Sequence, residues 1–293
     1  MRTKKDGTSA ILIKDMSMTA AIIGLGLMGG SLAMAMGKLP MIKNLIGFDH
    51  NKSHEEEALK LGLINSIVSF DEVKRADIII LAIPVDGIIA CLKDLEGVSD
   101  TTTIIDLGST KEKIVKSIPP NLRHNVVAAH PMTGTEKFGP SAALNDLYQE
   151  KVVVLCDLEN SGEHQQETAV RIFSQIHMKL VYMKAHEHDL HVAFISHMPH
   201  LISYSLANSV LKHEEHQNIL NLAAGGFRSM SRLAKSSPNM WGDIFRQNKT
   251  HLLDSLSYFE EELNQMKKMV QNDEWDALDA KMKDANSLHN ILK

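Results

Sequence analysis

Short apolar runs recur through the first half of the chain. Each is rich in β-branched residues and nearly continuous rather than alternating, and together they cover residues 19–24, 45–49, 76–84, 101–107, 125–130 and 151–157. Runs of this length and kind are typical of strands that are buried on both faces of a sheet. Stretches with helical spacing lie between them, at 86–95 and 111–117, and Ser53 and Glu56 have the spacing of a capping box that opens another helix. The alternation predicts a doubly wound, parallel α/β sheet.

The pattern changes after about residue 184, where strand-like runs end. Long amphipathic stretches follow at 186–212, 216–224, 227–235, 238–270 and 273–292. Their period predicts an all-helical second domain. We therefore expect a flexible leader at 1–18, with Met18 as an alternative start, an α/β domain at 19–184 and a helical domain at 185–293.

Composition narrows the class of protein. The 293 residues carry a formal net charge of −5, so no overall positive field exists for binding nucleic acid. No apolar run approaches the roughly 20 residues that a membrane span needs, and the apolar stretch of the leader is too short for a secretion signal. The two cysteines, Cys91 and Cys156, lie far apart in apolar runs, which predicts buried thiols and a cytoplasmic protein.

A glycine-rich turn directly follows the first predicted strand. Gly24, Gly26 and Gly29 have the spacing G-x-G-x-x-G, with Leu27 and Met28 between them. In a dinucleotide site the first glycine allows the tight turn, the second lets the backbone approach a pyrophosphate, and the third lets the helix pack close to the strand. The alternative is a glycine turn in an unrelated α/β protein, but the strand before the motif and the helix after it favour a Rossmann-type site.

Asp49 ends the second predicted strand, 20 residues after Gly29. A carboxylate at this place accepts hydrogen bonds from the ribose hydroxyls of NAD and repels the 2′-phosphate of NADP. His50 and Lys52 act in the opposite direction, because their charges would suit a phosphate. The sequence therefore predicts NAD as the cofactor.

Polar residues follow the later predicted strands, where ligands bind in open α/β sheets. Ile83 and Pro84 follow one strand, Ser109 follows the next, and His130 ends a third. An imidazole at this edge suits proton transfer near neutral pH. Its alternative is a loop histidine that only hydrogen-bonds the backbone. We favour His130 as the catalytic residue and expect the nearby Asp106 to be structural.

The helical half carries two further clusters. One contains His188, Ser196 and His200, of which the last two share a helix face if the helix continues through Pro199. Metal binding is one alternative, but no pair has a zincin spacing, and the cluster suits an anion or a carbonyl equally well, so we expect no metal. In the other cluster Arg228 and Arg232 lie one turn apart after two glycines, which predicts a carboxylate clamp; Trp241 follows.

These segments resemble the prephenate/arogenate dehydrogenases. The resemblance rests on GLGLMGGSLA, FDHN, ADIIILAIPV, DLGSTKEKI, HPMTGTEKFGP, HDLHVAFISHMPHLISYSLA and GGFRSMSRLAKSSPNMWGDIF, which occur in order between about residues 19 and 270. One departure is Thr110, where members of the family usually carry valine.

The resemblance implies NAD-dependent oxidative decarboxylation of prephenate to 4-hydroxyphenylpyruvate, in tyrosine biosynthesis, by a homodimer. It implies that His130 accepts a proton or hydrogen bond from the substrate hydroxyl, that Ser109 helps to hold that hydroxyl and the nicotinamide, and that Arg232 pairs with a carboxylate. It further implies a binding or supporting role for a set of surrounding residues: Ser196, His200, Trp241, His188 and Glu136. We expect no appended chorismate mutase or ACT domain.

Three alternatives remain from the sequence. Arogenate differs from prephenate by an ammonium on its side chain, and an acidic residue near that side chain would favour it. Another Rossmann-type reductase with a helical dimerisation domain would act on an imine or a 3-hydroxy acid and would not need the HPMTGTEK segment. An NAD-sensing regulatory protein would keep the glycine turn without His130, Ser109 and the arginine pair.

Overall fold

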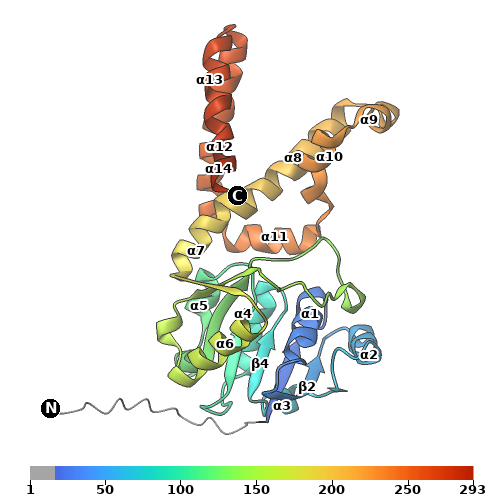
Figure 1. Ribbon diagram of the computed structural model, residues 1–293, viewed down its shortest axis with the longest axis vertical. Coiled ribbons are helices and arrows are strands. Elements are labelled where there is room, and N and C mark those ends of the chain that lie inside the picture. Colours follow the sequence, from blue (N-terminus) through green and yellow to red (C-terminus); the bar gives the residue numbers. More distant parts are fainter. Residues whose placement is uncertain (1–16, 293) are drawn as a thin grey trace, which may run out of the picture. The chain divides into compact units, whose positions relative to one another are not determined.

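The computed structural model describes residues 17–292, which divide into two compact units (Figure 1). We call the first the sheet unit; it contains residues up to His188 together with Ser236–Asp243. The second, the helical unit, contains Asp189–Lys235 and the residues from Ile244 onward. Apart from its last two positions, the expected leader lies outside the described residues. Met18 is buried and is the first residue of β1, so the strand begins one residue earlier than expected.

One eight-stranded sheet organises the sheet unit, in the order β3-β2-β1-β4-β5-β6-β7-β8. The strands are β1 (Met18–Ile23), β2 (Ile42–Phe48), β3 (Ser66–Ile67), β4 (Ile78–Leu81), β5 (Thr103–Asp106), β6 (Val126–Pro131), β7 (Val152–Cys156) and β8 (Lys179–Met183). This sheet with its flanking helices, followed by a helical region, confirms the expected fold class.

The expected parallel arrangement does not extend to β7, which pairs with β6 in antiparallel orientation. A parallel neighbour would need a crossover connection, usually a helix, to carry the chain back to the other edge. The segment between β6 and β7 contains only a short 3₁₀ turn, η2 (Pro140–Ala142), so β7 starts at the edge where β6 ends. The sequence pattern also missed β3 and β8, which are the two edge strands and bury less of their surface than the central ones.

Helices cover both faces of the sheet. They are α1 (Leu27–Met36), α2 (Lys52–Lys60), α3 (Phe70–Val73), α4 (Val85–Asp94), α5 (Glu112–Ser117) and α6 (Glu163–Gln175), with 3₁₀ turns η1 (Pro120–Asn125) and η3 (Leu158–Asn160). Apolar residues of α1 and α6 pack with one face of the central strands, and those of α3, α4 and α5 pack with the other. Cys91, in α4, is buried, and burial raises the pKa of its thiol to about 12, which makes it inert near neutral pH.

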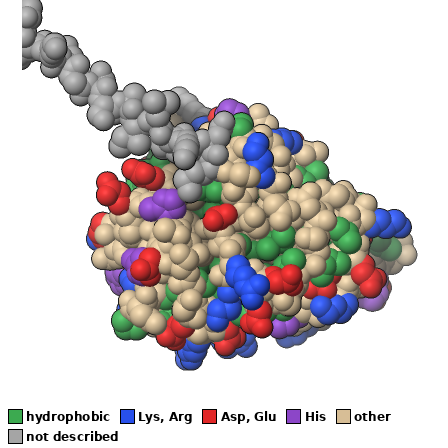
Figure 2. All heavy atoms as spheres, turned by 90° about the horizontal axis from the view of Figure 1, so that it is seen from below, with side chains coloured by type: hydrophobic (Ala, Val, Ile, Leu, Met, Phe, Trp, Pro, Cys, Tyr) green, Lys and Arg blue, Asp and Glu red, His purple; other side chains and the backbone are tan. Residues whose placement is uncertain are grey.

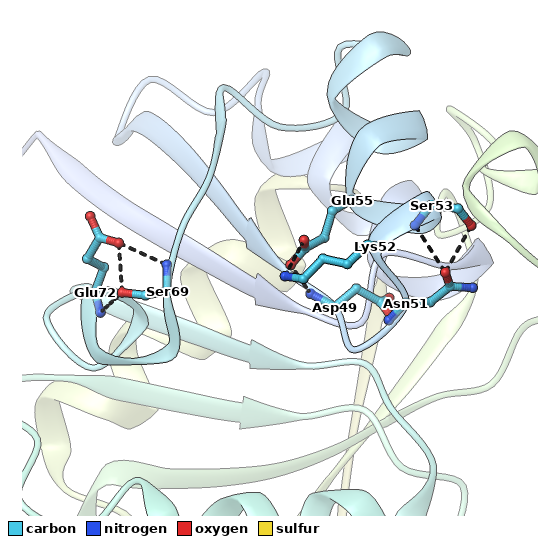
Figure 3. Close-up of polar contacts among 7 residues, drawn as sticks. All are labelled: Asp49, Asn51, Lys52, Ser53, Glu55, Ser69 and Glu72. Atoms are coloured by element: carbon cyan, nitrogen blue, oxygen red, sulfur yellow. Dashed lines mark hydrogen bonds and ion pairs between the residues drawn. The ribbon is translucent and has the colours of Figure 1, made fainter.

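The predicted capping box at Ser53 is wrong. Helix α2 begins at Lys52, and Asn51 is its N-cap, because the Asn51 side-chain oxygen accepts both the backbone N–H of Ser53 at 3.0 Å and its hydroxyl at 2.9 Å (Figure 3). A capping box instead opens α3, where Ser69 and Glu72 satisfy each other's backbone amides.

The helical half contains α7 (Ala185–Val192), a π-helical turn (Ala193–His197), α8 (Met198–His213), α9 (His216–Leu222), α10 (Gly225–Ser231), η5 (Arg232–Lys235), α11 (Pro238–Gln247), α12 (Lys249–Gln271), α13 (Trp275–Asn286) and α14 (Leu288–Ile291). The stretch expected to be continuous from 238 to 270 is interrupted at Asn248. Helices α12 and α13 lie side by side, and Lys281 bonds Gln265 at 3.0 Å and Glu262 at 2.7 Å (Figure 1).

Surface charges are mixed on the face that Figure 2 shows, where acidic and basic side chains alternate and neither sign forms a continuous patch. Among residues 17–292, no helix combines the length and apolar character that crossing a bilayer requires.

Candidate active site

The glycine turn joins β1 to α1, and its three glycines have different structural reasons. Gly24 has φ +91°, and a Cβ there would overlap the carbonyl oxygen of Ala82. A Cβ at Gly29 would overlap the carbonyl oxygen of Gly24. At Gly26, by contrast, the nearest atom to such a Cβ would be the Gly139 nitrogen at 4.0 Å. The space beside Gly26 is therefore open, as a pyrophosphate requires.

The first turn of α1 suits an anion. Gly26 is its N-cap and provides no side-chain cap, and no acidic residue occurs in the first turn. The amides of Leu27 and Met28 belong to the first turn of α1, whose N–H groups have no acceptor within the helix. These amides and the helix dipole favour phosphate at this end.

Asp49 lies directly after β2, and two main-chain amides fix its carboxylate. Its Oδ2 accepts the N–H of Leu25 at 2.8 Å, and its Oδ1 accepts the N–H of Asn51 at 2.9 Å. Leu25 belongs to the glycine turn, so the carboxylate is held next to that turn. This is the position from which ribose hydroxyls are bound in Rossmann-type sites.

The other strand-end residues lie at the same edge of the sheet, because β1, β4, β5 and β6 follow one another in this order across the sheet and each adjacent pair is parallel. Ile83 packs against Gly24, with its Cγ2 2.6 Å from where a Cβ would be, and Pro84 is the N-cap of α4. Ser109 is partly exposed in the loop after β5, and His130 is partly exposed near the end of β6. Parallel strand ends thus bring together four segments that are far apart in sequence.

His130 contacts a second histidine. Its Nδ1 lies 2.7 Å from Nε2 of His188, and the two rings meet edge to face with centroids 4.9 Å apart. His188 is only 1% exposed. We expected His188 as a substrate-binding residue; the structure places it against the ring of His130, where it orients the imidazole.

A buried ion pair supports the same edge. Lys111 and Asp106 are both fully buried and hydrogen-bonded to each other, and Lys111 Nζ also donates to the carbonyl oxygen of Ala129 at 2.7 Å. Burial raises the pKa of Asp106, while the charges of Lys111 and His188 act in the opposite direction. The pair ties the loop that carries Ser109 to the strand that carries His130.

The segment after His130 folds back onto α1. The Tyr148 hydroxyl donates to the carbonyl oxygen of Met28 at 2.7 Å, and the N–H of Leu144 donates to the Ser31 hydroxyl at 2.9 Å. Glu136, in the preceding loop, is exposed. The segment therefore lies beside the glycine turn, with Glu136 in its solvent-facing part.

In the helical unit, Ser196 and His200 belong to one continuous helical path. The π-helical turn Ala193–His197 leads into α8, which accommodates Pro199 in its first turn. His200 Nδ1 lies 2.8 Å from the Ser196 carbonyl oxygen. Burial lowers the pKa of His200, and the charge of Arg232 adds to this effect.

Arg228 and Trp241 have different surroundings. Arg228 is exposed and its Nε donates to the Ala223 carbonyl oxygen at 2.9 Å. Helix α10 ends at Ser231, so Arg228 is helical while Arg232 begins a 3₁₀ turn. Trp241, in the sheet unit, is 6% exposed. The two-arginine clamp stays a prediction.

Two residues around the site were missed by the sequence reasoning. The sequence reasoning placed Lys111 at the start of a helical stretch and gave it no partner, although a lysine five positions after a buried strand-end aspartate could have suggested an ion pair. Glu55 was overlooked because the predicted capping box assigned a role to Glu56 instead. The Glu55 side chain accepts the N–H of Asp49 at 3.1 Å (Figure 3). The sequence does not single out Glu55, because Glu56 and Glu57 are the same residue type at adjacent positions. The structure distinguishes them, since both are less buried than Glu55.

The sheet, the open space at Gly26 and the fixed carboxylate of Asp49 define a dinucleotide-dependent enzyme of the Rossmann class. Residues 32–182 match the family model for the nucleotide-binding domain of prephenate dehydrogenase, and residues 184–284 match the model for its dimerization domain. The chain belongs to the prephenate dehydrogenase family and is an NAD-dependent oxidoreductase.

Individual relatives cover nearly the whole chain. It is 33% identical to the prephenate dehydrogenase of Bacillus subtilis (strain 168), over 89% of this chain and 72% of the relative. It is 30% identical to the cyclohexadienyl dehydrogenase of Zymomonas mobilis, over 93% and 95%. The crystal structure of A. aeolicus prephenate dehydrogenase with hydroxyphenyl propionate and NAD+ superposes with a TM-score of 0.89 at 28% identity, covering 96% of this chain and 100% of that one.

Proposed function

We propose that the protein catalyses the NAD-dependent oxidative decarboxylation of prephenate to 4-hydroxyphenylpyruvate, in tyrosine biosynthesis. The observation that carries the proposal is His130, an imidazole oriented by His188 at the sheet edge that also carries the glycine turn. Family membership supports the substrate class.

The cofactor-binding residues are the glycine turn, with Gly24, Gly26 and Gly29, and Asp49. The amides of the first turn of α1 bind the pyrophosphate, and the Asp49 carboxylate binds the ribose hydroxyls. Ile83 and Pro84 line the site after β4. When bound, NAD supplies the acceptor for the hydride that leaves C4 of the substrate ring.

His130 acts as the base. Because Nδ1 is engaged by His188, we assign Nε2 to the substrate hydroxyl. The imidazole takes the hydroxyl proton as the hydride leaves, and Ser109 helps to hold the same oxygen. Loss of the ring carboxylate as CO2 leaves its electron pair in the ring, which becomes aromatic. The proton returns from His130 to the phenolic oxygen, so the base is regenerated.

We further propose that Arg232 supplies positive charge for the substrate, which is a dianion. Arg232 pairs with a carboxylate, and a guanidinium suits this role because it binds both oxygens. Burial and Arg232 lower the pKa of His200, which favours its neutral form near neutral pH. Ser196, His200 and Trp241 shape the pocket, and Arg228, Glu136 and the orienting His188 assist.

The protein is proposed to act as a homodimer in the cytoplasm, with a domain boundary near residue 184. The match to a dimerization domain supports the dimer. A composition with only two cysteines is typical of proteins from a reducing compartment.

One assay tests the proposal most directly. Purified enzyme and NAD are offered prephenate and arogenate in parallel, and NADH formation is recorded at 340 nm with identification of the aromatic product. We expect higher kcat/KM with prephenate and 4-hydroxyphenylpyruvate as product. A higher kcat/KM with arogenate would move the assignment to that substrate, and turnover of neither compound would overturn it.

A further inference from the structure

We infer that Glu55 is a second determinant of cofactor choice, which disfavours NADP by holding Lys52 and by adding a fixed negative charge beside Asp49. The inference deepens the cofactor assignment of the proposed function and rests on it. It concerns the loop between β2 and α2, where the adenosine ribose of a dinucleotide binds in Rossmann-type folds.

By sequence alone, this loop suits a phosphate. His50, Lys52 and His54 follow Asp49 within five positions, and the N-terminus of α2 lies in the same loop. Three cationic or ionisable side chains at a helix N-terminus would favour the 2′-phosphate of NADP. The preference for NAD therefore needs an explanation beyond the presence of one aspartate.

Glu55 removes Lys52 from this set. Its Oε2 accepts Lys52 Nζ at 2.7 Å, while its Oε1 accepts the backbone N–H of Asp49 at 3.1 Å (Figure 3). The Glu55 side chain is 2% exposed and that of Lys52 is 75% exposed. The buried carboxylate is thus the fixed partner, and the flexible ammonium is drawn toward it. Lys52 Nζ also lies 5.9 Å from the ring centroid of Phe48, which supports the same position.

Asp49 cannot turn away from an incoming phosphate. Both of its oxygens accept main-chain amides, from Leu25 at 2.8 Å and from Asn51 at 2.9 Å. His54 Nδ1 lies 3.6 Å from Oδ2, so this histidine also faces the carboxylate. Two carboxylates, at 49 and 55, are therefore held by backbone contacts at the end of β2.

The consequence is selection by repulsion. Ribose hydroxyls are donors and are attracted by the fixed Asp49 carboxylate. A 2′-phosphate would meet this carboxylate and the charge of Glu55, while Lys52 is held by Glu55. Discrimination built by an unfavourable contact with the wrong ligand is a general route to specificity.

The first test is Glu55→Gln, because glutamine keeps an oxygen for the Asp49 amide but removes the charge that holds Lys52. Dissociation constants for NADH and NADPH are measured by cofactor fluorescence with no substrate present. We expect NADPH to bind about five- to twentyfold more tightly, as lost repulsion and a released lysine would give at a screened surface, and NADH to change less than about threefold. Glu56→Gln is the matched control, since Glu56 is exposed on the same helix, and we expect no such gain.

A double-mutant cycle separates the two contributions of Glu55. Lys52→Met alone should change the NADPH to NADH ratio of dissociation constants by less than about threefold, because the lysine is already engaged. In the Glu55→Gln background, the same change should remove most of the gain in NADPH affinity. Circular dichroism of each variant shows whether it has folded.

An unchanged NADPH to NADH ratio in folded Glu55→Gln, or the same gain in Glu56→Gln, would overturn the inference. If Glu55→Gln does not fold, Lys52→Met tests the inference instead. A loss of NADPH affinity beyond about tenfold in this variant would show that Lys52 already binds the phosphate, and would contradict the inference. These titrations contain no substrate, so a failure of the proposed reaction with prephenate would leave their outcome unaffected.

Discussion

The sheet unit and the helical unit differ in how much they bury. Apolar side chains form continuous clusters on both faces of the sheet. In the helical unit, the buried apolar residues are Val192, Ala193, Ile244 and Leu252, and no described residue after Ser255 is buried. Large apolar side chains are instead exposed along its helices, including Ile195, Leu211, Leu220, Leu222, Met230, Leu253, Tyr258, Leu263 and Trp275.

The difference shows that the two units obtain stability from different sources. Burial of apolar surface contributes about 25 cal/mol per Å², so the sheet unit has an internal source that the helical unit lacks. Long amphipathic helices with exposed apolar faces gain stability when another surface covers them. The proposed homodimer supplies such a surface, which makes the helical unit dependent on association and the sheet unit self-sufficient.

The largest expected effect separates chemistry from binding. His130→Asn should lower kcat by about 10²–10⁴-fold, because a general base contributes this much, while the dissociation constant for NADH stays within about twofold. Steady-state kinetics and a fluorescence titration measure both. Wild-type turnover by this variant would show that His130 is not the general base.

Buried and exposed ion pairs in the two units should respond differently. Lys111→Met leaves the buried Asp106 carboxyl without its cationic partner, and should lower the free energy of unfolding by about 3–5 kcal/mol. Lys283→Met breaks a pair with Asp279 at 2.6 Å that is more than half exposed on both sides, and should cost less than about 1 kcal/mol. Urea unfolding followed by circular dichroism compares them, and equal costs would contradict the difference in burial.

Arg232→Ala tests the role of the helical unit in substrate binding. Loss of a charge-assisted bond to a carboxylate should raise the KM for prephenate about ten- to hundredfold, with a smaller effect on kcat. Lys235→Ala is a matched control, since it removes an exposed cation from the same 3₁₀ turn. If both variants raise the KM equally, the effect comes from the general positive charge of this turn, and the specific ion pair between Arg232 and the substrate carboxylate is contradicted.

Association should depend on apolar side chains of the helical unit. A variant with Leu220→Asp and Leu222→Asp places charges on side chains that are 71% and 77% exposed, and should raise the dimer dissociation constant at least about tenfold. Leu59→Asp, on α2 of the sheet unit, is the control and should leave it unchanged. Sedimentation velocity over a range of concentrations measures both, and an unaltered dimer in the double variant would exclude α9 from the interface.

The smallest effect concerns a single hydroxyl. Thr110 is fully buried, and its Oγ1 has no hydrogen-bond partner among the residues that the structure describes. Thr110→Val should therefore stabilise the protein by about 1 kcal/mol, whereas Thr110→Ser keeps the hydroxyl and should destabilise it. A lower unfolding midpoint for Thr110→Val would show that the hydroxyl is satisfied.

Much of the site could be predicted because its signals are local. The strain at Gly24 and the close approach at Gly29 require glycine, and Asp49 follows a strand whose pattern is unambiguous. The partner of His130 could not be predicted, since His188 is 58 positions away and only the tertiary packing within the sheet unit brings the two rings together. The Lys111–Ala129 bond depends in the same way on strand order.

The sequence by itself determined the central strands, the glycine turn and the helical character of the second half, because burial on two faces and helical periodicity are written into consecutive residues. The tertiary structure alone decided the antiparallel direction of β7, the engagement of Lys52 by Glu55 and the pairing of the two histidines. These features depend on which groups, distant in sequence or competing for the same partner, come within hydrogen-bond distance in the folded chain. The pattern of residue types along the sequence does not specify those distances.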